Sequence, residues 1–101
     1  MDWERIMSDA EMIKNKLLLL NVNLSEAEKL GNYFSYKKYD ERAINRYLRI
    51  MAESPPPRSK KTQRHYKGLQ QIWREWRTNL KGEEKAIAWG WGVKLAHAGK
   101  R

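Results

Sequence analysis

Apolar side chains recur every three or four residues over most of this 101-residue chain, and this spacing constrains its fold more than any other feature. The clearest run comprises Trp3, Ile6, Ala10, Ile13, Leu17, Leu20 and Leu24. Steps of alternately three and four residues place side chains on one face of an amphipathic α-helix. The run therefore predicts a first helix that begins near Trp3 and that Asn21 and Asn23 end or bend.

Two more helices are predicted before residue 54. Ser25 and Glu28 form a capping-box pattern, which satisfies free backbone N–H groups at a helix start. The second helix then runs through Leu30 and Phe34. Asp40 can cap a third helix. The apolar positions of the third helix follow the spacing i, i+3, i+4, i+7: Ile44, Tyr47, Leu48 and Met51.

Three consecutive prolines, Pro55 to Pro57, end the third helix, because proline lacks a backbone N–H and cannot continue it. The stiff segment 54–58 is the predicted joint of the chain. Beyond it, Ser59 can cap a fourth helix, and Lys81 with Gly82 forms the turn after that helix. The apolar stripe of the fourth helix comprises Tyr66, Leu69, Trp73, Trp76 and Leu80.

The last segment allows two interpretations. Large and small side chains alternate from Ile87 to His97, which is typical of a strand, and glycine disfavours a helix interior. No other segment offers a partner strand, however, and a lone strand leaves its backbone groups unsatisfied. We therefore favour a fifth helix, which Glu83 and Glu84 open and Gly99 ends, with a strand over 87–97 as the alternative.

These elements predict a single all-α domain over residues 1–101, a compact bundle of about five helices with a proline-rich joint at residues 54–58. A hydrophobic fraction of 41% with five tryptophans supports a packed core and excludes a disordered chain. Four tryptophans are predicted to be buried in that core: Trp73, Trp76, Trp89 and Trp91. Trp3, near the terminus, is predicted to contact another chain.

Charge is distributed unevenly along this domain. Residues 1–57 hold nine basic and nine acidic side chains, so the half formed by residues 1–53 is neutral. Residues 58–101 hold twelve basic and three acidic side chains, so the net charge of +9 arises there, in the basic half 59–101 and Arg58. A one-sided basic surface repels itself and is typical of a protein with a polyanionic partner.

Several function classes are excluded or weakened by what the chain lacks. Without cysteine it has no disulfide, Cys-ligated zinc or thiol chemistry. His65 and His97 are too few for a metal site, and no nucleophile has an adjacent base. We therefore predict no enzyme, no metal, no cofactor and no small-molecule substrate.

The sequence also gives expectations about location. The longest apolar run, Leu17 to Leu20, is far shorter than the ~18 residues of a membrane span. The residues after Met1 form neither a signal peptide nor a transit peptide. We expect a cytoplasmic protein with no membrane partner.

The fourth helix carries the strongest binding signal. With its apolar stripe on heptad positions a and d, its cations fall on the outward positions, and they form a ridge with Glu75 as its one acid. Such a ridge can follow a sugar–phosphate backbone without reading bases. The predicted contacts are Arg58, Lys60, Lys61, Arg64, Lys67, Arg74 and Lys81.

A second basic patch is predicted around the third helix. Arg42, Arg46 and Arg49 follow the spacing i, i+4, i+7 and so share one face, and Lys37 and Lys38 precede them. The tyrosines that precede this face could stack on bases or pack into the core: Tyr33, Tyr36 and Tyr39.

The segment from Ser59 to Tyr66 (SKKTQRHY), together with the size and the all-helical pattern, resembles the small-subunit family of class 1 (type I and type III) CRISPR effector complexes. A weaker likeness lies in the closing run from Ala88 to Ala96, and the resemblance covers roughly residues 25–98. It implies a non-catalytic subunit of a ribonucleoprotein complex in antiviral defence. Several copies would stack beside the other subunits and hold a single strand, in a guide–target hybrid or displaced from a duplex.

The resemblance places strand contacts on Arg58, Lys60, Lys61, Arg64 and Lys67, and Arg74 extends them. Two other classes stay open. A helical DNA-binding regulator would read bases from a recognition helix. Its candidate base-reading residues are Gln63, Arg64, Gln70 and Gln71. A structural adaptor would instead bind an acidic protein with the same basic face.

Overall fold

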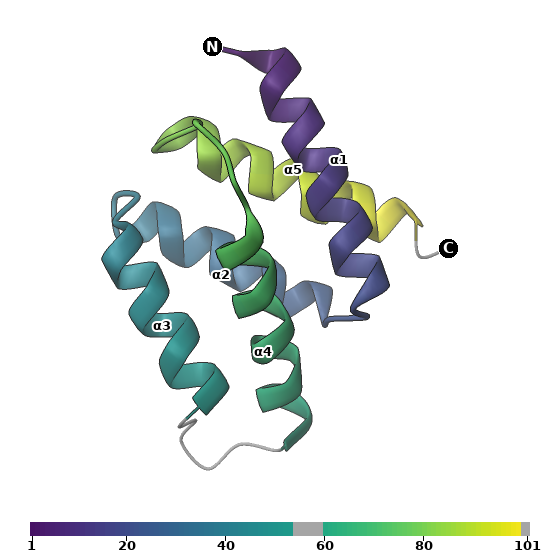
Figure 1. The fold of residues 1–101 in the computed structure, drawn as a ribbon, viewed down its shortest axis with the longest axis vertical. Coiled ribbons are helices and arrows are strands. Elements are labelled where there is room, and N and C mark those ends of the chain that lie inside the picture. Colours follow the sequence, from purple (N-terminus) through teal and green to yellow (C-terminus); the bar gives the residue numbers. More distant parts are fainter. Residues whose placement is uncertain (54–59, 100–101) are drawn as a thin grey trace.

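The structure is a computed structural model that describes residues 1–53 and 60–99. Within these ranges every regular element is an α-helix, which confirms the predicted all-α bundle of about five helices (Figure 1). In chain order they are α1 (Trp3–Leu19), α2 (Leu24–Tyr36), α3 (Glu41–Glu53), α4 (Lys60–Glu75) and α5 (Glu83–Gly99). The predicted joint at 54–58, Arg58 and the Ser59 cap lie outside the described residues.

The predicted apolar stripe of the first helix forms the buried face of α1. The Asp2 side chain caps the helix by accepting a hydrogen bond from the backbone N–H of Arg5. The stripe residues with no exposed surface are Ile6, Ala10, Ile13 and Leu17. The helix ends at Leu19, and Asn21 turns the chain with a φ of 51°. Leu24, expected on the same stripe, therefore begins α2 instead.

Asn23 caps α2, and the predicted capping box at Ser25 is wrong. The Asn23 Oδ1 accepts hydrogen bonds from the backbone N–H groups of Ser25 (2.8 Å) and Glu26 (3.2 Å). The Asn23 backbone N–H donates to Nδ1 of His65 on α4 at 3.0 Å. Because the asparagine satisfies these groups two residues earlier, the serine lies inside the first turn of the helix.

Helices α3 and α4 lie side by side and run in opposite directions (Figure 1). The Asp40 carboxylate caps α3 as predicted, by accepting from the backbone N–H of Arg42 at 2.9 Å. Polar bonds then join the two helices along their length. They pair Trp73 Nε1 with the Glu41 carboxylate (3.2 Å), the hydroxyls of Tyr47 and Tyr66 (3.0 Å), and Gln63 Nε2 with the Ala52 carbonyl (2.9 Å).

The fourth helix ends at Glu75, whereas its apolar stripe predicted a helix to near Leu80. Trp76 and Leu80 are nevertheless buried, so a non-helical segment carries the end of the stripe into the core. Lys81, predicted on the outer face of the helix, lies in the connection to α5 instead.

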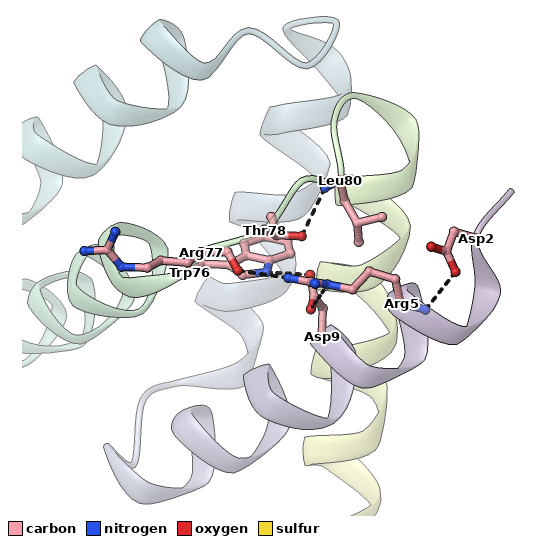
Figure 2. A network of polar contacts seen from close by, with 7 residues as sticks. All are labelled: Asp2, Arg5, Asp9, Trp76, Arg77, Thr78 and Leu80. Atoms are coloured by element: carbon pink, nitrogen blue, oxygen red, sulfur yellow. Dashed lines mark hydrogen bonds and ion pairs between the residues drawn. The ribbon is translucent and has the colours of Figure 1, made fainter.

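Where the sequence predicted a further turn of α4, Trp76 and Arg77 instead form a network of polar contacts with α1 (Figure 2). The indole N–H of Trp76 donates to the buried carboxylate of Asp9 at 3.0 Å. The Arg5 guanidinium donates to the same carboxylate at 2.9 Å and to the backbone carbonyl of Arg77 at 3.1 Å. These hydrogen bonds hold residues 76–77 against α1. If α4 continued as a helix through these residues, they would move away from α1.

Residues 87–97 are helical, as favoured over the strand alternative. The glycines of this segment were the argument against a helix. At one of them, Gly92, the packing of α5 against α1 explains the glycine. A Cβ at this position would lie 2.6 Å from Ile13 Cγ2 and 3.1 Å from the Ala10 carbonyl oxygen. Gly92 therefore allows α5 to approach α1 closely.

Contacts at both ends show that α1 and α5 run in the same direction. Near their starts, the backbone N–H of Asp2 donates to the Glu84 carboxylate at 2.9 Å. Near their ends, Gly99 lies against the side chain of Leu18. The pair lies beside α2 and α4, and the core continues from there to α3.

Three of the four tryptophans predicted to be buried do lie in the core. Trp73, Trp76 and Trp89 are 4%, 5% and 0% exposed, with ring centroids 5.2–6.0 Å apart. Trp91 is 40% exposed, so its predicted burial is wrong, because its neighbour Gly92 faces α1. Trp3 is 52% exposed, and its contact with another chain stays a prediction.

Candidate nucleic-acid interface

Two basic sets that are separate in the sequence meet in one groove between α3 and α4. The groove has a volume of about 520 Å³. Its lining comprises Arg42, Asn45, Arg46 and Arg49 from α3, with Gln70 and Arg74 from α4. Antiparallel packing thus adds Arg74 of the predicted α4 ridge to the predicted α3 patch. We name this feature the arginine groove.

The arginine groove has the spacing and the donor chemistry that a sugar–phosphate backbone requires. Arg42 and Arg46 are one helical turn apart, a rise of about 6 Å, and Arg49 follows three residues later. This step is close to the separation of successive phosphates in a single strand. Each guanidinium is planar and can bind a phosphate with two parallel hydrogen bonds.

The positive charge of the arginine groove is not neutralised by its surroundings. No acidic residue is among its lining residues, and none of its arginines forms an ion pair within residues 1–53 and 60–99. Glu75, the one acid of α4, is held by Lys16 of α1 at 2.9 Å. This hydrogen bond lowers the pKa of the Glu75 carboxyl, and the negative charge of Glu75 therefore lies next to Lys16 of α1.

The ridge predicted along α4 is divided between two flanks of the helix. Arg74 faces the arginine groove, whereas Lys61 and Arg64 line a second hollow, of about 490 Å³, beside the α1–α2 turn. His65 and His97 line the same hollow. Ten residues correspond to about 2.8 turns, so Arg64 and Arg74 lie on different flanks of the helix.

Among the described residues, the other predicted contacts lie outside both hollows. Lys60 and Lys67 are exposed on the outer side of α4 between its two flanks. Lys81 lies in the α4–α5 connection, and Lys38 lies exposed in the turn after α2 with a φ of 54°. Arg58 is outside the described residues.

Of the three tyrosines considered for base stacking, two pack against other rings. Tyr33 stacks on Tyr47 with centroids 4.4 Å apart, and Tyr39 meets the edge of Phe34 at 5.6 Å. Tyr36 is 77% exposed. The stacking hypothesis is therefore restricted to Tyr36.

The side chains of Lys85 and Tyr66 carry groups that can act in catalysis or binding, but here both stabilise the fold. Lys85, one of the cations of the basic half, is buried, pairs with Glu41 at 2.8 Å and lies 4.6 Å from the Trp73 ring centroid. Tyr66 donates to the Glu26 carboxylate at 2.5 Å. Burial raises the pKa of the Tyr66 hydroxyl, and this hydrogen bond raises it further. Both residues tie separate helices together.

The described ranges contain no group of three His, Asp or Glu side chains arranged to hold a metal ion. The buried ring of His65 accepts a hydrogen bond from Asn23 and so links α4 to the start of α2. As for membranes, α1 to α5 include no helix with the length and hydropathy of a spanning segment.

Sequence reasoning missed Asn45 and assigned Gln70 only to a regulator. Asn45 lies three residues after Arg42 and four before Arg49, so helical spacing does place it beside the arginine face. No sequence pattern indicates that this flank of α3 meets the Gln70 flank of α4.

No protein-family model, curated protein or solved structure matches this chain.

Proposed function

We propose that this protein binds single-stranded nucleic acid in the arginine groove and catalyses no reaction. The observation that carries the proposal is the convergence of four arginines on one groove with no acidic lining. Keeping four like charges together is unfavourable for the isolated domain, and a polyanion relieves this repulsion. A strand is the partner whose charges repeat at the spacing of the arginines.

We further propose the cellular setting that the resemblance implies. In it, the protein is a cytoplasmic small subunit of a class 1 CRISPR effector complex and contacts a guide–target hybrid or a displaced strand. The segment from Ser59 to Tyr66 and the five-helix fold support this setting. One domain offers few cations to a strand, so several copies along the strand would gain affinity through effective concentration.

Strand binding is tested by fluorescence anisotropy with a labelled single-stranded 12-mer. Arg46→Ala with Arg74→Ala removes one arginine from each side of the groove and should weaken binding at least tenfold, since hydrogen bonds to charged groups contribute about 1.5–3 kcal/mol each. The slope of log K against log salt should become less steep by up to about 1.4. The control, Lys14→Ala with Lys29→Ala, removes two helical cations outside the groove.

A flat salt response, or equal losses from both double variants, would remove the arginine groove as the strand site. Strong preference for one duplex sequence would favour the regulator. Binding to an acidic protein without any binding to nucleic acid would favour the adaptor.

The cellular setting needs a separate measurement. Purification of the tagged protein from its native cells should recover effector-complex subunits and a guide RNA, identified by mass spectrometry and sequencing. Recovery of the protein without RNA would reject the proposed complex and leave strand binding by the isolated domain standing.

A further inference from the structure

The arginine groove contains two amide side chains as well as its arginines, and their place follows from the contact that joins α3 to α4. Gln63 Nε2 donates to the Ala52 carbonyl where the two helices meet. Gln70 lies seven residues after Gln63, and Asn45 lies seven residues before Ala52. Seven residues are about two turns, so in this antiparallel pair both amides return to the line of contact between the helices.

The arginines lie farther from this line of contact. On α4, Arg74 is exposed whereas Gln70 is half-buried. On α3, Asn45 and the three arginines are all exposed, and the seven-residue spacing places Asn45 closest to the line through Ala52. The groove therefore has guanidinium groups toward its outer edges and amides toward the seam between the helices. A strand whose phosphates lie on the guanidinium groups can turn its bases toward the seam.

The amides have unused hydrogen-bonding capacity. Neither the Asn45 nor the Gln70 side chain makes a hydrogen bond to a residue in the described ranges, whereas Gln63 on the same flank does. An amide presents one acceptor and two donor hydrogens in a plane. Asparagine and glutamine amides are known to pair through two hydrogen bonds with adenine, whose N6 donates and whose N7 accepts, and this edge is accessible in an unpaired strand.

We infer that Asn45 and Gln70 contact the bases of a strand held by the arginine groove, and that they favour adenine. The inference rests on the proposed strand binding. It replaces the sequence-based expectation of a contact to the backbone alone, and it adds a base preference that phosphate contacts cannot provide.

The test uses three labelled 12-mers with the same number of phosphates: oligo-dA, oligo-dT and an abasic strand. We expect the unmodified protein to bind oligo-dA about fivefold more tightly than oligo-dT, and to bind the abasic strand most weakly. Asn45→Ala with Gln70→Ala should reduce the ratio of the two affinities to near one. Gln71→Ala, a change on the outer side of the same helix, should leave the ratio as it was.

The salt slope separates this inference from the function on which it rests. Equal binding of the abasic strand, or an unchanged affinity ratio in the Asn45→Ala, Gln70→Ala variant, would overturn base contact. If Arg46→Ala with Arg74→Ala still lowered the salt slope, strand binding by the arginines would stand alone. If no strand bound with a salt-dependent affinity, the proposed function itself would fail and take the inference with it.

Discussion

Helices α1 and α5 run in the same direction and meet through small residues, whereas α3 and α4 run in opposite directions and meet through polar side chains. At Gly92 the absence of a side chain brings α5 against the backbone of α1. Between α3 and α4, hydrogen bonds of Gln63 and Tyr66 hold the helices together, and the groove beside them stays open.

This difference separates two tasks in a small domain. Close contact buries the apolar surface of α1 and α5, which is the main source of folding free energy. The α3–α4 pair keeps four like charges beside one another, at a cost in repulsion that the buried core must offset. We therefore expect substitutions around α5 to change stability and substitutions in the arginine groove to change binding.

The largest expected effect is at Trp89, whose indole is fully buried and donates to the Ala27 carbonyl at 2.8 Å. Trp89→Ala should cost about 3–5 kcal/mol of unfolding free energy, which lowers the melting temperature by roughly 15 °C or more in a domain of this size. Circular dichroism melts measure it. Trp91→Ala, at a half-exposed ring, is the control, and an equal loss there would contradict the observed exposure.

Two glycines of α5 should respond in opposite directions. Gly92→Ala places a Cβ 2.6–2.8 Å from Ile13, and the overpacking should exceed the gain in helix propensity by about 1–2 kcal/mol. Gly90→Ala meets no atom within 4 Å and should stabilise the protein by up to ~1 kcal/mol. Urea unfolding of both variants measures the difference. Equal effects would mean that α1 and α5 are not closely packed.

Tyr66→Phe tests whether polar bonds stabilise the other helix pair. Removing the hydroxyl breaks its bonds to Glu26 and Tyr47, at a cost of about 1 kcal/mol near neutral pH. The pKa of Tyr66 is raised in the folded state, so its stabilising effect is present below the unfolded pKa of about 10 and is lost as the pH rises above it. Urea unfolding from pH 8 to 11 should show the two proteins converging above about pH 10. Parallel curves would show that ionisation of Tyr66 does not contribute to the loss of unfolding free energy at high pH.

The smallest expected change in stability is at Arg46. Its side chain is exposed, and Arg46→Ala should alter the unfolding free energy by no more than about 0.5 kcal/mol while strand binding weakens. Melting and anisotropy on the same sample measure both. A large fall in melting temperature would show that the arginine groove serves the fold, and the division between the two helix pairs would be lost.

Much of the fold could be predicted because helix formation and capping are local. The steps of three and four residues predicted α1, and its stripe is buried from Ile6 to Leu17. Asp40 caps α3 as predicted, since the bond it accepts comes from two residues away. The shared face of Arg42, Arg46 and Arg49 also follows from helical spacing alone.

The misplaced cap of α2 has a local cause, since Asn23 lies two residues before Ser25, whereas two other errors in the prediction have long-range causes. The fourth helix ends at Glu75 because Asp9 and Arg5, more than sixty residues earlier, bind the atoms that follow it. Trp91 lies at the surface because the flank of α5 that meets α1 contains its neighbour Gly92. Neither contact leaves a pattern within a window of one or two helical turns.

The sequence by itself determined the five helices, their apolar faces and the excess of cations in the second half. Only the tertiary structure decided that Arg74 joins the arginines of α3 while Arg64 lies on another flank, and that Asn45 and Gln70 share their groove. Helical spacing gives the angle of each side chain about its own axis. The rotation of one helix against another is set by how the whole core packs, which no single helix encodes.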